Sequence, residues 1–352
     1  MRALLLRRFG GAPDLETVPE PEAGPGEVVV DIVACGVGLT TCNCLRGDLG
    51  DDPALLPVVP GHELVGIVTV VGPGVDEGLL GQRVTAHFTL FCGRCRTCLA
   101  AREPLCPDGL GVIGVQRHGG LAERVAIPAR NVVPIPAVLD SVDATVVPDA
   151  VATPVHVAAR AGITAGDRVA VIGAGGGVGV HMVQVAAVHG ASVAGLEVDP
   201  QKLAFLADEL GVPAVDAHRI ERAALPAAWG GMADVVVDFV GAAATVGWSL
   251  DHLDAGGRLV VVTTFPGVAA PMVPRQLVLG QLSVLGSRYA SRAELFAAAA
   301  LVADGRVRPV IGERADLDGA PALLARLARS AVVGRGVVTV ASIGAEGGGA
   351  SA

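Results

Sequence analysis

The chain has 352 residues, of which 51% are hydrophobic and 17% are charged, and its formal net charge is −9. This length suggests two domains, and this composition is sufficient to bury a large core. The negative charge and the low aromatic content, with one Tyr, two Trp and seven Phe, argue against nucleic acid as a partner. No apolar run approaches the ~18 residues that a membrane span needs, so no membrane association is expected.

The first part of the chain, up to residue 148, is punctuated by Gly and Pro and contains short β-type runs. The start, MRALLLRRFG, has too short an apolar stretch for a signal peptide, so it is interpreted as a first strand of a cytoplasmic protein. Further strands are expected in EVVVDIVAC, ELVGIVTVVG, QRVTAHF and AERVAIPA. Strands at this spacing, separated by turn residues, predict a β-rich, barrel-like domain.

Four cysteines in one loop predict a structural metal site in a lobe of about residues 90–107. They are Cys92, Cys95, Cys98 and Cys106, in the run CGRCRTCLAAREPLC. Four thiolates at this spacing can surround one Zn²⁺ and leave no open position, which is typical of structural zinc. The alternatives are two disulfides or a coincidental group of buried cysteines. Disulfides are disfavoured because small disulfide-dense scaffolds are exported and much shorter. We therefore expect one structural zinc per chain.

From residue 149 to 285 strand and helix patterns alternate, which predicts a parallel, doubly wound sheet. The run RVAVI leads into a glycine-rich turn and then into an apolar-periodic helix. Glycines permit a tight turn and let backbone amides approach a pyrophosphate at the helix N-terminus. The candidate dinucleotide-binding residues of this turn are Gly173, Gly175, Gly176, Gly177, Val178 and Gly179.

The end of the next strand indicates which dinucleotide is bound. Glu197 closes this strand, and an acid there accepts hydrogen bonds from both ribose hydroxyls and repels a 2′-phosphate. NAD is therefore expected rather than NADP. A solvated strand end is the alternative interpretation of Glu197, and Asp199 is a second candidate acid. The strand in ADVVVDFVG is expected to place Val240 and Gly241 near the nicotinamide ring.

Together these motifs resemble the medium-chain dehydrogenase/reductase superfamily, in its zinc-containing alcohol dehydrogenase branch. The most specific stretches are PVVPGHELVGIVTVVGPGV, the four-cysteine lobe, GGLAERVAIPARNVVPIP, DAVATPVHVAARAGITAGDRVAVIGAGGGVG and DAGGRLVVV. The resemblance implies a GroES-like catalytic domain over residues 1–148 and 286–342, and a Rossmann domain over residues 149–285. It also implies a small-molecule substrate and a homodimer or homotetramer. The polar, glycine-rich tail, residues 343–352, is expected to be disordered.

The resemblance also implies where a catalytic zinc would lie. Members that use one hold it with a Cys, a His followed by Glu, and a further Cys or carboxylate. His62 and Glu63 match the His–Glu pair, and Asp149 falls at the position of the last ligand. The first-ligand position, however, is Gly38, in the run CGVGLTT.

Two neighbouring positions of this loop also lack the residue that the family pattern has there. The acid that supports the zinc ligands is replaced by Thr41, and a frequent relay histidine by Asn43, although the relay hydroxyl is kept as Thr40. Glycine offers no donor atom, so we expect the catalytic zinc to be absent. Cys42, about one helical turn after Gly38, is one conceivable substitute ligand. The simpler interpretation is that Cys42, like Cys35 and Cys44, is a small buried hydrophobic residue.

Three functions follow from these features. The first is an NAD(H)-dependent oxidoreductase that acts on a carbonyl, an alcohol or an activated C=C or C=N bond without a catalytic zinc. Its candidate catalytic residues are Thr40, His62, Glu63 and Asp149, with His62 either a proton donor or only a structural residue. The second is an ordinary alcohol dehydrogenase whose zinc is held by His62 and Asp149 with Glu63 or Cys42. The third is a catalytically silent nucleotide-binding protein.

Overall fold

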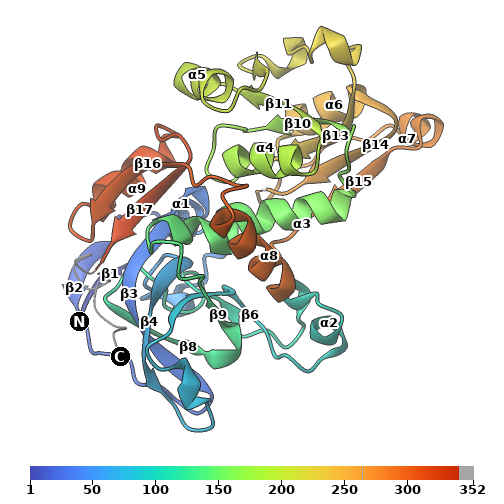
Figure 1. Ribbon diagram of the computed structural model, residues 1–352. Helices are drawn as coiled ribbons and strands as arrows, with labels where there is room; N and C mark the ends of the chain where they lie inside the picture. The colour runs from blue at the N-terminus through green and yellow to red at the C-terminus, as the bar shows by residue number, and fades with distance from the viewer. Residues whose placement is uncertain (264, 341–352) are drawn as a thin grey trace. The chain divides into compact units, whose positions relative to one another are not determined.

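The structure is a computed structural model that describes residues 1–263 and 265–340 (Figure 1). The predicted tail, residues 343–352, lies outside the described residues. The chain forms two compact units. The first unit contains Met1–Pro148, Glu313–Ala331 and the described residues from Gly336 onward, and the second contains Asp149–Gly312 and Val332–Arg335. In the described part of the chain no helix is long and apolar enough to cross a membrane.

The first unit is built around a seven-stranded sheet with the order β16-β17-β3-β4-β5-β9, in which β8 also pairs with β3. The strands of this unit are β1 (Arg2–Leu5), β2 (Asp14–Thr17), β3 (Glu27–Val37), β4 (Glu63–Val71), β5 (Arg83–Ala86), β6 (Thr89–Leu90), β7 (Gly111–Val112), β8 (Arg124–Pro128), β9 (Val132–Pro134), β16 (Ile311–Asp316) and β17 (Arg335–Thr339). Its helices are α1 (Leu39–Arg46), α2 (Arg96–Leu99) and α9 (Ala320–Ala328). The predicted β-rich domain is therefore present, and it includes all the strands expected before residue 130.

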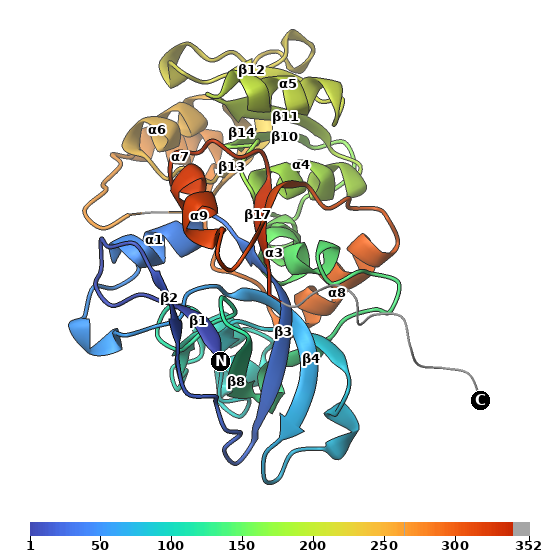
Figure 2. The same cartoon turned by 90° about the vertical axis from the view of Figure 1, so that its left-hand side faces the viewer.

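Strand β3 organises the first unit because it pairs antiparallel with three other strands, β4, β8 and β17. Its valines other than Val33, and its alanine, are buried, as expected for a strand with neighbours on both edges. At its end the chain enters α1, whose first turn carries Thr40 and Thr41. Helices α1 and α9 lie side by side (Figure 2).

The second unit contains a six-stranded parallel sheet with the order β12-β11-β10-β13-β14-β15. Its strands are β10 (Arg168–Ile172), β11 (Ser192–Glu197), β12 (Ala214–Asp216), β13 (Ala233–Asp238), β14 (Leu253–Val261) and β15 (Ser283–Gly286). Its helices are α3 (Ala152–Ala161), α4 (Gly179–Val188), α5 (Pro200–Asp208), α6 (Ala243–Asp251), α7 (Pro274–Gly280) and α8 (Arg292–Ala303). From β10, the strands β11 and β12 are added on one side of the sheet, and β13, β14 and β15 are then added on the other. This is the doubly wound arrangement predicted from the sequence.

Helices cover both faces of this parallel sheet (Figure 1). A Cβ atom on Gly195 would lie 2.9 Å from Leu206 of α5, so this side of β11 faces α5. The adjacent positions of β11, Ala194 and Leu196, belong to a buried cluster with Trp248 of α6. Because successive strand residues point to opposite faces, α5 and α6 lie on opposite sides of the sheet.

The segment from residue 286 to 312 packs with the second unit, whereas the sequence analysis assigned it to the first. Helix α8 packs against α3, and the Nδ1 atom of His156 lies 2.9 Å from an oxygen of Glu294. The buried residues of α8 are Leu295, Ala298, Ala299 and Val302. These contacts join residues far apart in the chain, so the local sequence pattern did not indicate on which side of the boundary α8 belongs.

Candidate active site and structural metal centre

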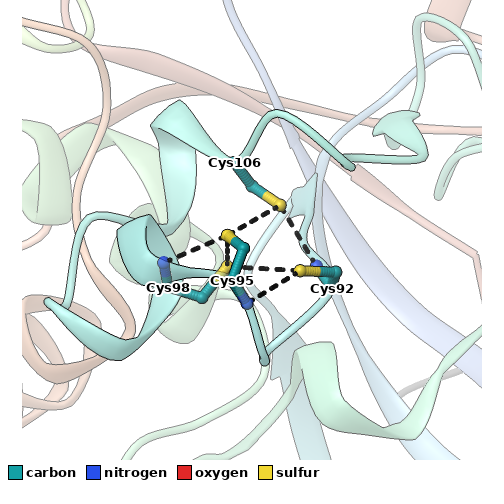
Figure 3. A group of neighbouring side chains, drawn as sticks. All are labelled: Cys92, Cys95, Cys98 and Cys106. Carbon is teal, nitrogen blue, oxygen red and sulfur yellow. Dashed lines mark hydrogen bonds between the residues drawn. The ribbon is translucent and has the colours of Figure 1, made fainter.

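The four cysteines of the predicted metal site converge on one point (Figure 3). The Sγ atoms of Cys95 and Cys98 are 3.5 Å apart, and the Cys92–Cys98 and Cys95–Cys106 pairs are each separated by 3.9 Å. Four sulfurs placed tetrahedrally ~2.3 Å from one zinc ion lie about 3.8 Å from one another, whereas disulfide-bonded sulfurs are only ~2.0 Å apart. The spacing therefore fits a Zn²⁺ ion, and all four cysteines are free thiols.

The local backbone prepares these sulfurs for a metal. Cys95 caps the N-terminus of α2, and the N–H groups of Cys92, Cys95 and Cys98 donate to the sulfurs of Cys106, Cys92 and Cys95 at 3.3, 3.4 and 3.5 Å. The N–H of Cys98 is the main reason why the pKa of Cys95 falls to about 6, while burial raises the pKa of Cys98 to about 12. Four thiolates thus need a cation to be stable together, and a divalent metal would supply that charge.

The predicted dinucleotide turn follows β10, and several of its glycines are required for different reasons. Gly173 has a φ of +78°, a backbone conformation that favours glycine. A Cβ atom on Gly175 would lie 2.5 Å from the Cβ of Lys202, and one on Gly177 would overlap the side chain of Arg335. A Cβ atom on Gly179 would overlap the carbonyl of Gly173, so helix α4 can begin directly against the turn.

Glu197, the predicted ribose-binding acid, lies beside this turn. It is 8% exposed, and its carboxylate accepts hydrogen bonds from the N–H of Gly175 at 3.0 Å and of Val198 at 2.8 Å. Asp199, the second candidate, accepts instead from two N–H groups in the first turn of α5 and is its N-cap. The acid that contacts the glycine-rich turn is therefore Glu197, and Asp199 has a structural role as a helix cap.

Lys202 was not singled out by the sequence analysis. Its side chain is 6% exposed and packs against Gly175, close to Glu197 in the chain. Lysine is seldom so deeply buried. The one feature of the sequence that could have pointed to Lys202 is its position in the first turn of the helix that follows Glu197.

The carboxyl end of β13 carries Val240 and Gly241, the residues predicted to lie near the nicotinamide. The buried carboxylate of Asp238 accepts from the N–H groups of Val240 at 2.8 Å and Gly241 at 3.0 Å, and from the hydroxyl of Thr245 at 2.6 Å. Val240 is 39% exposed. Asp238 thus fixes the backbone of this turn while the side chain of Val240 stays accessible at the edge where doubly wound sheets bind ligands.

In the first unit, Gly38 joins β3 to α1. It has an extended backbone, with φ −155°, that any residue can adopt. Thr40 is partly buried, and Thr41 is 1% exposed with a hydroxyl that makes no hydrogen bond. The thiol of Cys42 donates to the carbonyl of Leu324 in α9 at 3.6 Å, as expected of a buried cysteine that packs between helices.

His62 and Glu63 are adjacent and almost completely buried at the start of β4. The ring of His62 meets that of Phe88 edge to face, with centroids 4.7 Å apart. The Oε2 atom of Glu63 would lie 2.7 Å from a Cβ atom on Gly36 in β3, so a larger residue at position 36 would displace this carboxylate. Sequence reasoning identified His62 and Glu63 but gave no indication of the contact with Phe88.

Asp149, the expected third zinc ligand, lies in the second unit and is 6% exposed. Its Oδ1 atom accepts from the hydroxyl of Thr153 at 2.7 Å, and its Oδ2 atom from the guanidinium of Arg335 at 3.2 Å. Arg335, which the sequence analysis missed, reaches Asp149 from a position 186 residues away in the chain.

The four cysteines are the one group of three or more potential ligands whose donor atoms lie within 4.8 Å of one another in residues 1–263 and 265–340. In the first unit, Gly38 offers no metal-binding donor atom, and the thiol of Cys42 is hydrogen-bonded to the carbonyl of Leu324. In the second unit, the carboxylate of Asp149 accepts a hydrogen bond from Arg335.

Comparison with known proteins agrees with this architecture. Residues 24–137 match the alcohol dehydrogenase GroES-like domain family, and residues 177–304 match the zinc-binding dehydrogenase family. An alcohol dehydrogenase of Geobacillus stearothermophilus is 33% identical over 338 residues, which is 95% of this chain and 98% of that protein. The chain belongs to the zinc-containing alcohol dehydrogenase family of the medium-chain dehydrogenases/reductases.

Two further relatives extend this result. An L-threonine 3-dehydrogenase of Mesorhizobium japonicum is 35% identical over 76% of this chain and 77% of that protein. The crystal structure of an NAD-dependent alcohol dehydrogenase superposes with a TM-score of 0.86 at 32% identity, over 97% of this chain and 100% of that one. The predicted GroES-like and Rossmann folds are thereby confirmed, and so is the prediction of an alcohol dehydrogenase-like, NAD(P)-dependent oxidoreductase.

Proposed function

We propose that the protein is an NAD(H)-dependent oxidoreductase that transfers a hydride to or from a small molecule without a catalytic zinc, and that it carries one structural zinc at the four cysteines. The substrate would contain a carbonyl, an alcohol or an activated C=C or C=N bond. The observation that carries hydride transfer is the glycine-rich turn after β10 with the Glu197 carboxylate hydrogen-bonded to it. NAD would supply the hydride acceptor or donor at its nicotinamide ring.

The preference for NAD rests on the carboxylate of Glu197. It is held beside the turn and is nearly excluded from solvent, so a 2′-phosphate placed there would meet an unscreened negative charge. Lys202 packs on the same turn and would add a positive charge near the ribose and phosphates. Because Glu197 ends the strand where the ribose is expected, we infer that its repulsion outweighs the attraction of Lys202.

Proton transfer must accompany hydride transfer, because reduction of a carbonyl adds a hydride to carbon and a proton to oxygen. Thr40, His62, Glu63 and Asp149 are the candidate catalytic residues. Thr40 is the more accessible hydroxyl of α1, and His62 carries an imidazole, a group that can donate or accept a proton. A purely structural role for His62, packed against Phe88, is the alternative.

Zinc dependence is the competing proposal, and the description of the family as zinc-binding dehydrogenases favours it. It would require His62 and Asp149 to hold an ion together with Glu63 or Cys42. Gly38, without a donor atom at the first-ligand position, favours the zinc-free reaction. Catalytic silence is the remaining alternative, and detection of any hydride transfer would eliminate it.

The test combines metal analysis with an activity screen. Metal-replete protein should contain about one zinc per chain, and NADH oxidation should be measured with aldehydes, ketones, conjugated carbonyls and imines before and after dialysis against a mild chelator. We expect hydride transfer to at least one class, with a rate that dialysis leaves unchanged. Two tightly bound zincs per chain, or activity that is lost and then restored by added Zn²⁺, would contradict the proposal.

We also propose a homodimer or homotetramer in the cytoplasm. Strand β15 is the edge of the parallel sheet, and the neighbouring helix α7 exposes Val278 and Leu279 at 71% and 65%. An open strand edge beside exposed apolar side chains is a surface that a second copy of the chain would cover. Light scattering after size exclusion tests this, and a monomeric mass would contradict it. Free thiols in a zinc lobe suit a reducing compartment.

A further inference from the structure

Two carbonyl groups of the glycine-rich turn each accept a hydrogen bond from another part of the second unit. The N–H of Gly334, which has a φ of +66°, donates to the carbonyl of Gly175 at 3.1 Å. The Nδ1 atom of His181, in α4, lies 2.8 Å from the carbonyl oxygen of Gly177. The turn is therefore held by its carbonyl groups, and one of the two contacts comes from a side chain.

The imidazole of His181 is fully buried and uses both of its nitrogen atoms. Its exposed fraction is 0%, and its Nε2 atom lies 3.1 Å from the backbone nitrogen of Val310, in the segment that follows α8. A carbonyl can only accept and a backbone N–H can only donate, so Nδ1 carries the proton and Nε2 accepts. The ring is neutral at neutral pH: burial lowers the pKa of His181 to about 4, opposed by the hydrogen bond to Gly177 and assisted by the charge of Arg335.

The bond from His181 decides which way the peptide group between Gly177 and Val178 faces. In a regular α-helix the carbonyl of residue 177 would accept from the backbone N–H of residue 181. Here that N–H donates to the carbonyl of Val178 at 3.1 Å, and the imidazole takes its place. Because C=O and the following N–H of a trans peptide point in opposite directions, the N–H of Val178 points away from α4, past its N-terminus. This is the direction from which helix N-termini bind phosphate groups.

The other nitrogen of His181 connects the turn to the same pair of backbone segments that holds Gly175. Val310 is followed by Ile311, which forms an antiparallel bridge with Gly334. The bonds of Gly334 to Gly175 and of His181 to Gly177 therefore start from adjacent segments. The position of the turn thus depends on the chain beyond α8, and His181 is the side chain that transmits it.

We propose that His181 is a positioning residue for the dinucleotide: its Nδ1–H group keeps the carbonyl of Gly177 turned toward α4, so that the N–H of Val178 faces the pyrophosphate. This inference rests on the proposed function and deepens it. His181 does not touch the cofactor and acts through the backbone of the turn. The bond to Val310 holds the ring in place, whereas the bond to Gly177 aims the donor.

Two amide substitutions separate the two hydrogen bonds of His181. In His181→Asn the side-chain NH₂ falls near the place of Nδ1 and can donate to Gly177, whereas in His181→Gln the amide oxygen falls near the place of Nε2 and can accept from Val310. Fluorescence titration gives the dissociation constant for NADH, and urea midpoints give stability. His181→Asn should bind NADH within about threefold of the unaltered protein, and His181→Gln at least about tenfold more weakly, because a hydrogen bond to a charged phosphate is misaligned. Equal affinities in the two variants, or losses that only follow the urea midpoints, would overturn the proposal.

His252 provides a matched control in the same unit. Its Nδ1 atom also lies 2.8 Å from a carbonyl four residues earlier, that of Trp248, but it is not part of the glycine-rich turn. His252→Gln should leave the affinity for NADH unchanged. A loss as large as that of His181→Gln would show that any histidine of this kind affects binding through stability, which would overturn the specific role of His181.

A measurement without cofactor keeps the test decisive if a variant folds poorly. In unaltered protein with isotope-labelled histidine, the nitrogen resonances of His181 should show a protonated Nδ1 and an unprotonated Nε2 at neutral pH. The opposite tautomer or a charged ring would overturn the proposal. Failure of the unaltered protein to bind either dinucleotide would refute the proposed function itself, whereas equal affinities of the Asn and Gln variants refute only the role of His181.

Discussion

Single residues would decide the proposed chemistry of this protein, and Glu197 is the clearest case. Its carboxylate is anchored by two backbone N–H groups, one of them from the glycine-rich turn, which would keep it facing a ribose bound as proposed. The same anchoring means that replacing Glu197 changes both the charge and the stability of the turn. Any test of cofactor choice must therefore separate these two effects.

Replacement of Glu197 by Ser should narrow the preference for NADH over NADPH, since the repulsion of the 2′-phosphate is removed. Dissociation constants for both cofactors, from fluorescence titration, give this ratio. Glu197→Gln is the matched control, because it removes the charge but keeps the size and one acceptor oxygen for the N–H of Gly175. If the unaltered protein binds NADPH more tightly than NADH, the assignment of Glu197 to the ribose is wrong.

At the level of residues, the sequence predicted local geometry where the signal was local. The four cysteines and the glycine-rich turn each lie within a few residues of one another, and their geometry follows from short loops and a helix start. Lys202 and Arg335 were missed because their importance arises from contacts with Gly175 and Gly177, not from their own neighbours in the chain.

At the scale of elements, the cysteine lobe and helix α8 illustrate two ways of holding a segment in place. The lobe contains little regular structure, with α2 only four residues long. Its shape therefore depends on its sulfur atoms. Helix α8 depends instead on an apolar face and on the Glu294 carboxylate, which accepts from the N–H of Ser291 and contacts His156 of α3.

Replacement of Cys95 by Ser should lower the thermal midpoint and the zinc content together, because three thiolates hold zinc less tightly than four. The expected loss is on the order of a few kcal/mol. Differential scanning calorimetry with elemental analysis measures both quantities. Cys44→Ser is a useful comparison: Cys44 is buried outside the lobe, and its substitution should leave the zinc content at one per chain. A Cys95→Ser protein with normal zinc and an unchanged midpoint would refute the structural site.

The attachment of α8 should weaken in acid. The pKa of Glu294 lies below its ordinary value of 4.5 because His156 and the N–H of Ser291 donate to its carboxylate, against the opposing effect of burial. A carboxyl group with a lowered pKa stabilises the folded state above its unfolded pKa, and this contribution is lost as the pH falls through the folded value. The protection factors of the amide hydrogens in α8 should therefore fall below about pH 4.5, and Glu294→Gln should reduce this pH dependence. An identical acid response in Glu294→Gln would contradict the assignment.

The boundary near α8 shows why the division into units was harder to predict than the folds. The alternation of strands and helices identified the parallel sheet, and Gly- and Pro-punctuated strands identified the β-rich part. The pattern could not show that residues 286–312 pack with α3, since that depends on contacts across more than a hundred residues, such as His156 with Glu294.

For the whole molecule, the positions of two residues allow the units to be followed separately. The chain has two tryptophans, Trp229 and Trp248, and both are buried in the core of the second unit. The zinc lobe belongs to the first unit. Tryptophan fluorescence therefore reports on the unit that does not contain the metal.

Removal of zinc with a strong chelator should shift unfolding measured by far-ultraviolet circular dichroism, which detects both units, to lower urea concentration. Unfolding measured by tryptophan fluorescence should shift less, because the second unit loses no ligand. The divergence of the two curves is the expected result, and it should disappear when Zn²⁺ is restored. Coincident curves that shift by the same amount would mean that the two units unfold as one.

The contact between Gly334 and Gly175 has a consequence for the way this enzyme is made. The ribosome makes Gly175 well before Gly334, so the segment that packs on the turn, Val332–Arg335, emerges only after the parallel sheet between them has been made. Until then the turn lacks the backbone hydrogen bond that holds it from outside. A chain interrupted before Val332 would lose this contact, and the turn at which the dinucleotide is proposed to bind would be held less firmly.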